Sequence, residues 1–273
     1  MNYCTPKEIA STALQAVVRK SQLSVAYMLV LGILAGAYIG FAAEGSTMAM
    51  HDITSVGAGR FLAGVIFSTG LMLVLICGAE LFTGNVLLCI GCLKHKISLQ
   101  LMFWNWFWVY LGNLAGSVLL AYMMDASGLW SYNHYLHGAY ALKIAVAKVN
   151  LSFGEAFTRG ILCNWLVCLA VWMAYAAKDI AGKVWGIFFP IMLFITSSFE
   201  HSVANMYYLT AGLLLKRDPV IVAASGLADQ AESLHITGVI MNNLLPVTLG
   251  NIIGGVVFVG SCYWYCYLKE ESL

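Results

Sequence analysis

The chain has 273 residues and a formal net charge of +1, with 61% hydrophobic and only 10% charged residues. Its mean hydropathy of +0.82 lies far outside the range of soluble proteins. This composition predicts an integral membrane protein, and the near-neutral charge gives no reason to expect nucleic acid as a partner.

The beginning of the chain lacks the features of a signal peptide. Its first 20 residues include Lys7, Arg19 and Lys20 and contain no apolar segment of their own. We therefore expect no cleavable signal peptide.

Six apolar runs with few or no charges follow, at residues 24–43, 61–92, 97–124, 160–177, 184–215 and 236–268. A bilayer core about 30 Å thick is crossed by about 20 helical residues. The pattern predicts an all-α protein with six transmembrane helices, forming a single domain over residues 1–273.

The second and fifth runs carry the same interrupted motif, Glu80-x4-Asn85 and Glu200-x4-Asn205. Each run is too long for one straight span and holds a carboxylate near bilayer depth, where ionisable side chains are expensive. We predict that both helices are broken, at residues 83–85 and 202–205, and that the breaks meet at the centre of a transport pathway.

The two halves of the chain also share a second motif. Residues 105–116 follow the pattern N-x6-G-N-x2-G, and residues 243–254 follow it again. A unit of three helices that occurs twice must enter the membrane from opposite sides. We therefore predict two inverted repeats, at about 20–124 and 157–268, with the paired glycines allowing close helix packing.

The distribution of cations predicts the orientation. Eight lysines and arginines fall on the side that holds the termini and the two short connectors, and six fall in the longer connectors of the other side. The positive-inside rule places both termini in the cytoplasm.

Two half-helix N-termini at the midplane would attract anions. We expect Glu80 and Glu200 to be structural, bonding loop backbone N–H groups and hidden from the pore. His201 is the only histidine within a predicted span, and it can donate a hydrogen bond or exchange a proton.

The cysteines give little support for redox or metal chemistry. Cys89-x2-Cys92 has no matching second pair, and its flanks are aliphatic. We predict no metal and no cofactor. A haem oxidoreductase would need paired histidines within the spans, which the sequence lacks.

Five segments resemble the formate/nitrite transporter family. They are GAELFTG at 78–84, NW with GN at 105–113, GILCNWLVCLA at 160–170, EHSVANM at 200–206 and LPVTLGN at 245–251. The resemblance covers nearly the whole chain. It implies an aquaporin-like protomer, a homopentamer in the cell (inner or plasma) membrane, and a channel rather than an enzyme.

The resemblance also implies the roles of individual residues. His201 would be the central pore histidine with Thr83 as its hydroxyl partner, and Lys148, Asn164 and Val167 would lie close to the pathway. The implied constrictions are an outer one of Phe67, Leu71 and Phe194 and an inner one of Leu81 and Phe82. Without the resemblance, Lys148 could equally be an ordinary loop cation.

One departure bears on the substrate. Residues 82–85 read FTGN, where formate channels of the family often read FTST, and the chain is more similar to the hydrosulfide-conducting subgroup. The predicted function is a channel for hydrosulfide, with formate and nitrite as further anions, linked to protons through His201. The alternative is an aquaporin-like channel for small neutral solutes, although neither break contains the proline of an Asn-Pro-Ala loop.

Overall fold

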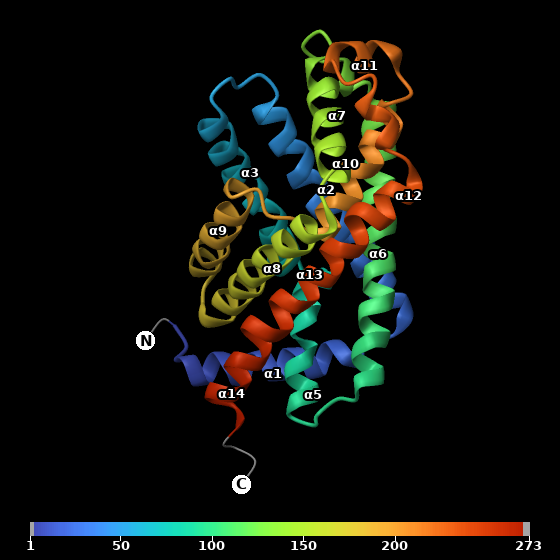
Figure 1. The fold of residues 1–273 in the computed structure, drawn as a ribbon. Coiled ribbons are helices and arrows are strands. Elements are labelled where there is room, and N and C mark those ends of the chain that lie inside the picture. The colour runs from blue at the N-terminus through green and yellow to red at the C-terminus, as the bar shows by residue number, and fades with distance from the viewer. Residues whose placement is uncertain (1–2, 270–273) are drawn as a thin grey trace.

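The computed structural model describes residues 3–269, in which helices joined by loops make up the regular secondary structure and no β-strand occurs. Figure 1 shows an elongated bundle in which α1 (Pro6–Ser21) lies across the end that carries both chain termini. Helices α7 (Leu136–Val149) and α11 (Pro219–Ser225) lie at the opposite end. The long helices connect these two ends.

Within residues 3–269, five helical stretches are long and apolar enough to cross a bilayer. They are α2 (Val25–Met50), α3 (Val56–Cys77), α6 (Leu99–Ser127), α8 (Phe153–Ala176) and the continuous stretch Ile236–Tyr267. The chain is therefore a multi-pass membrane protein, as its composition predicts.

Two π-helical segments interrupt the α-helical winding of the last of these stretches. It consists of α12 (Ile236–Gly238), η4 (Val239–Leu244), α13 (Leu245–Gly255), η5 (Val256–Ser261) and α14 (Cys262–Tyr267), where η4 and η5 are π-helical. Pro246, which has no N–H to donate, follows directly after η4 in the first turn of α13. A π-helical turn is wider than an α-helical one. The turn of η4 before Pro246 therefore accommodates the proline, and the helix continues past it.

The second and fifth apolar runs are each interrupted. In the second run α3 is followed by α4 (Phe82–Asn85), η1 (Val86–Leu88) and α5 (Cys89–Leu93). The fifth run consists of α9 (Ile180–Thr196) and α10 (Ser202–Leu215). The non-helical residues are 78–81 and 197–201. The breaks therefore lie a few residues earlier than predicted, and residues 83–85 and 202–205 form first helical turns instead.

Backbone conformation explains this shift. Gly78 has φ +85° and Ser198 has φ +59°, so the left-handed conformation that ends a helix occurs before each glutamate. His201 then caps α10 by accepting a hydrogen bond from the Ala204 N–H.

Glycines set the closest helix contacts. A Cβ atom on Gly116 of α6 would overlap the carbonyl oxygen of Ile33 on α2, and one on Gly250 of α13 would overlap that of Phe157 on α8. The same motif thus brings α6 against α2 and α13 against α8, which supports the packing role predicted for these glycines.

Candidate functional site

The first break is held by a cluster of four side chains, here called the Glu80 cluster. The Lys20 Nζ lies 2.7 Å from Glu80 Oε1, and the Asn85 Nδ2 donates to Glu80 Oε2 at 2.7 Å. Asn85 also donates to Asn105 Oδ1 at 2.9 Å, and Asn105 donates to the Lys20 carbonyl at 3.1 Å. The buried carboxylate is thereby paired with a cation from α1.

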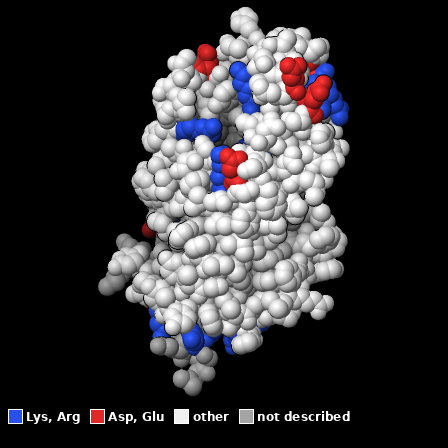
Figure 2. Space-filling model, viewed as in Figure 1, with Lys and Arg blue, Asp and Glu red and all other residues white. Residues whose placement is uncertain are grey.

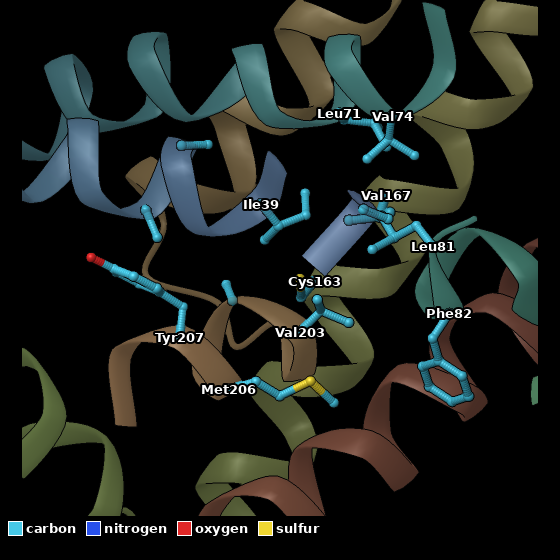
Figure 3. Close-up of a cluster of buried hydrophobic side chains, with 14 of the residues drawn as sticks. Ile39, Leu71, Val74, Leu81, Phe82, Cys163, Val167, Val203, Met206 and Tyr207 are labelled. Carbon is cyan, nitrogen blue, oxygen red and sulfur yellow. The ribbon is translucent and has the colours of Figure 1, made fainter. Parts of the chain in front are cut away.

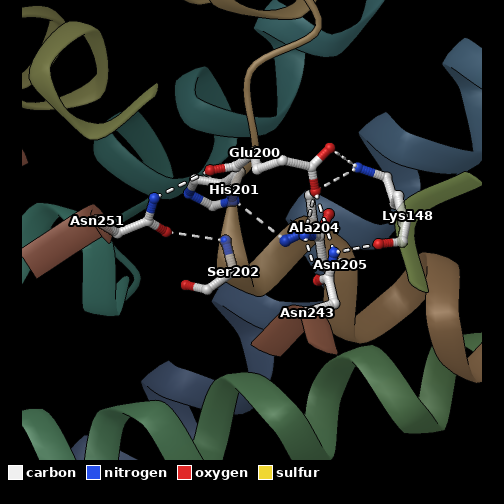
Figure 4. A network of polar contacts seen from close by, with 8 residues as sticks. All are labelled: Lys148, Glu200, His201, Ser202, Ala204, Asn205, Asn243 and Asn251. Atoms are coloured by element: carbon white, nitrogen blue, oxygen red, sulfur yellow. Dashed lines mark hydrogen bonds and ion pairs between the residues drawn. The ribbon is translucent and has the colours of Figure 1, made fainter. Parts of the chain in front are cut away.

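The second break has the same arrangement, here called the Glu200 cluster and drawn in Figure 4. The Lys148 Nζ donates to both carboxylate oxygens of Glu200, at 2.9 and 3.0 Å. Asn205 donates to Glu200 Oε2 at 2.6 Å and to Asn243 Oδ1 at 2.7 Å, and Asn243 donates to the Lys148 carbonyl at 3.0 Å. The lysine–glutamate, asparagine–glutamate, asparagine–asparagine and asparagine–carbonyl contacts of the Glu80 cluster all recur here. The bond from the Lys20 Nζ to the Asn85 Oδ1, at 3.0 Å, does not recur.

Asparagines rather than glutamates bind the loop backbone. Asn113 Oδ1 accepts from the Phe82 N–H and Asn251 Oδ1 accepts from the Ser202 N–H, both at 2.9 Å. The other end of each amide donates to two carbonyl oxygens, one of which belongs to the glutamate of that break. The prediction that the carboxylates bind loop N–H groups is therefore wrong: they bind lysine and asparagine side chains.

Thr83 and His201 meet between the two breaks. The Thr83 Oγ1 lies 2.8 Å from the His201 Nε2, and both side chains are buried. The His201 Nδ1 accepts from the Ala204 N–H at 3.1 Å, and a backbone N–H can only donate. The neutral ring therefore carries its proton on Nε2 and donates it to the Thr83 hydroxyl.

Aromatic rings lie next to this pair. The ring centroids of Phe67 and Phe194 are 5.7 Å apart and those of Phe194 and His201 are 6.0 Å apart. Phe67 and Phe194 are each only 1% exposed. Two of the residues predicted to form the outer constriction thus make an edge-to-face ring pair, and the third, Leu71, lies one helical turn beyond Phe67 on α3.

The two residues of the predicted inner constriction point in different directions. Figure 3 shows Leu81 directed toward Val167 and Leu71, whereas Phe82 points away from them. Leu81 and Leu71 line a cavity of about 20 Å³. The Phe82 ring instead packs edge-on against Tyr110, with centroids 5.0 Å apart, and against Trp106.

Asn164 ties the centre to the second half of the chain. Its Nδ2 donates to the carbonyls of Thr83 at 3.1 Å and Asn251 at 2.7 Å. Its Oδ1 is buried without a hydrogen-bond partner among residues 3–269. The Asn164 Oδ1 is therefore available to accept a hydrogen bond next to the Thr83–His201 pair.

Two cavities flank the breaks at opposite ends of the molecule. The α7 cavity has a volume of about 120 Å³, and its lining includes Arg60, Lys148, Arg159, Glu200 and Tyr208. The α1 cavity has a volume of about 340 Å³, and its lining includes Arg19, Lys20, Glu80 and Tyr175. Glu80 and Glu200 thus line the cavities and are not hidden from them. The lining of each cavity thus includes two or three basic side chains.

Several of these residues were not predicted as site residues. Lys20 and the four asparagines at positions 105, 113, 243 and 251 hold the breaks, and Arg60 and Arg159 line the α7 cavity. The repeated pattern N-x6-G-N-x2-G was the available signal for the asparagines. Within the described part of the chain, no group of three metal-binding side chains occurs, and the Cys92 thiol lies 3.7 Å from the Met102 sulfur.

This fold and site define a helical membrane transport protein with a buried polar centre between two basic cavities. A model of the formate/nitrite transporter family matches residues 7–265. The chain is 37% identical to the "Probable formate transporter" of Methanothermobacter thermautotrophicus, over 98% of this chain and 99% of the relative. It is 36% identical to the "Formate channel FocA" of Escherichia coli K12, over 98% and 95%.

A solved structure, "Pentameric formate channel with formate bound", superposes with a TM-score of 0.83 at 39% identity. The match covers 90% of this chain and 98% of that one. The chain belongs to the formate/nitrite transporter family. Membership in this family of transporters favours anion transport over the aquaporin-like alternative.

Proposed function

We propose that the protein is a channel for small monovalent anions of weak acids, with formate as the first substrate to test. The observation that carries this proposal is the buried Thr83–His201 pair, 2.8 Å apart, between two cavities lined by cations. Relatives at 36–37% identity over nearly the whole chain are named as formate transporters or channels.

In the proposed pathway an anion moves from one cavity past the central pair to the other. Hydrogen-bond donors and half-helix N-termini stabilise negative charge at the centre. The Phe67–Phe194 pair cannot repay the desolvation of a bare ion, which costs tens of kcal/mol in a medium of ε ≈ 4. The anion therefore passes either partly hydrated or as its neutral acid.

The contacts of His201 favour a hydrogen-bond donor over a proton relay. A second proton on the ring would have to sit on Nδ1, where it would displace the Ala204 N–H bond that caps α10. Proton linkage through His201 therefore stays a prediction, which the pH series below tests.

We further propose six membrane crossings arranged as two inverted repeats, about 20–124 and 157–268, with both termini in the cytoplasm. The matched contacts of the Glu80 and Glu200 clusters support the repeat. By analogy with the pentameric formate channel, five protomers would assemble, each with its own pathway.

Hydrosulfide and nitrite are further candidate substrates. The residues that depart from the common formate-channel pattern, Gly84 and Asn85, line the small cavity beside Leu81. A difference there changes the walls of the proposed path and can therefore change the preferred anion.

The experiment is flux through purified protein in liposomes, comparing formate, nitrite, hydrosulfide and chloride at several pH values. We expect formate flux well above that of empty liposomes. No flux of any of the four anions would refute the proposed function, and hydrosulfide flux above formate flux would assign the protein to the hydrosulfide subgroup.

A further inference from the structure

The α7 cavity contains more positive charge than its buried ion pair accounts for. Its lining includes Arg60, Lys148 and Arg159 but only one carboxylate, that of Glu200. In Figure 2, basic side chains lie around part of the rim of a hollow in the upper part of the molecule, with an acidic side chain beside one of them. The question is which of these cations attracts an anion from solution.

Lys148 is neutralised where it lies. Its Nζ contacts both Glu200 oxygens, its side chain is 15% exposed, and that of Glu200 is 6% exposed. Its ammonium group also lies 5.3 Å from the centre of the Tyr208 ring. An incoming anion meets this pair as a dipole, whose attraction falls off faster with distance than that of a free charge.

The two arginines are not neutralised in this way. Arg60, in the first turns of α3, is exposed and makes no hydrogen bond or ion pair with another residue in the described range 3–269. Arg159 has one long contact of 3.9 Å to Glu155, and the two side chains are 39% and 54% exposed, so this pairing is weak. Their guanidinium groups stay charged at every physiological pH.

We propose that Arg60 and Arg159 form an anion-capture site that loads small monovalent anions into the α7 cavity, while Lys148 stabilises Glu200. The proposal rests on the proposed function and deepens it. A guanidinium can donate two parallel hydrogen bonds to the oxygens of a carboxylate. Cations at a cleft mouth raise the local anion concentration and thus the association rate.

The test is initial formate influx into liposomes whose α7 end faces outward, measured over a range of formate concentrations. The variant is the double substitution Arg60→Gln, Arg159→Gln. At about 0.01 M salt, where the Debye length is about 30 Å, we expect its half-saturating formate concentration to rise roughly tenfold. The maximal flux should change less than twofold, because the central pair is untouched. At about 0.15 M salt the difference should shrink, since the Debye length is about 8 Å.

Two further variants make the result specific. Arg217→Gln removes an exposed positive charge that does not line the α7 cavity, and it should leave the half-saturating concentration unchanged. The double Arg→Lys variant restores the charge and should recover most of the loss.

If the double Gln variant kept the wild-type half-saturating formate concentration at low salt, the capture site would be refuted and the proposed function would stand. The same conclusion would follow if Arg217→Gln raised that concentration as much as the double variant does. If wild-type protein carried no formate, the proposed function would fail and the capture site with it.

Discussion

At the residue scale, His201 serves two structures at once. Its Nδ1 caps α10 and its Nε2 bonds Thr83. Asparagine is a good N-cap but is too short to replace the Nε2–H, whereas alanine removes both functions. The two substitutions therefore separate the cap from the central donor.

We predict that His201→Asn keeps its thermal stability, while His201→Ala loses about 1 kcal/mol from the missing cap. In both variants the flux ratio of formate to chloride should fall about tenfold. A hydrogen bond to a charged group contributes about 1.5–3 kcal/mol, and about 1.4 kcal/mol corresponds to a tenfold change in a ratio. The measurements are thermal unfolding and liposome flux. Wild-type selectivity in both variants would show that His201 only caps the helix.

A second prediction compares three phenylalanines. Phe194→Ala and Phe67→Ala should raise the flux of acetate relative to formate, because each removes one ring of the buried pair. Phe82→Ala should leave this ratio unchanged, because the Phe82 ring packs against Tyr110 and Trp106. Phe82→Ala should instead lower the free energy of unfolding by about 3–5 kcal/mol.

Liposome flux with both anions and thermal unfolding check these outcomes. An altered acetate ratio in Phe82→Ala with wild-type ratios in the other two variants would reverse the assignment of the constriction.

At the element scale, the glycine contacts set how closely the long helices approach. Gly116→Ala should destabilise the protein by about 1–3 kcal/mol, because the added methyl group would overlap the Ile33 carbonyl. Gly154→Ala is the matched control, since a Cβ there has no neighbour within 4 Å and alanine favours the helix. Equal unfolding temperatures for the two variants would contradict the packing role.

A histidine connects α7 to two membrane helices. The His137 Nε2 lies 2.8 Å from Glu44 Oε1 on α2, and Glu44 accepts a 2.5 Å hydrogen bond from Tyr207 on α10. Burial lowers the pKa of His137, but the hydrogen bond and charge of Glu44 and the Leu129 carbonyl outweigh it, so the pKa is raised. The ring of His51 lies 5.6 Å away.

The raised pKa of His137 fixes the direction of a pH effect. Because the folded protein binds this proton more tightly, protonation of His137 stabilises the folded state. The stabilisation is complete below the pKa of an unfolded histidine, about 6.5, and is lost as the pH rises through the higher pKa of the folded state. We predict that the unfolding temperature falls over that range in the wild type and falls less in His137→Gln. Identical slopes in the two proteins would contradict the paired histidine.

The sequence predicted the elements unevenly. The long apolar helices and the existence of two interruptions follow from apolar length and the Glu-x4-Asn motif. The exact breaks do not, because they depend on the left-handed backbone at Gly78 and Ser198, and serine carries no strong signal for it. Helices α1 and α7 were missed because an apolar-run search finds spans and passes over short amphipathic helices.

The site shows the same division. His201 could be singled out as the only histidine within a predicted span, whereas Thr83 as its hydroxyl partner came only from the family resemblance. The partners of Glu80 and Glu200 were not, because Lys20 is 60 residues from Glu80 and Lys148 is 52 from Glu200. Contacts over such separations depend on the packing of whole helices, which the local pattern does not specify.

At the scale of the whole molecule, the outer face of α6 exposes large apolar side chains, among them Phe103, Trp104 and Phe107. Such faces are covered by lipid or by neighbouring subunits. We predict that native mass spectrometry of detergent-solubilised protein gives five subunits. A stable monomer with full flux would contradict the proposed pentamer.

The central claim is that the protomer conducts a small anion and not a small neutral solute of the kind that aquaporin-like channels carry. The most direct measurement loads the same liposomes with differently labelled formate and glycerol and follows the release of both through purified protein. The account predicts rapid release of formate, while glycerol stays at the rate of protein-free liposomes. Release of glycerol with retention of formate would contradict it.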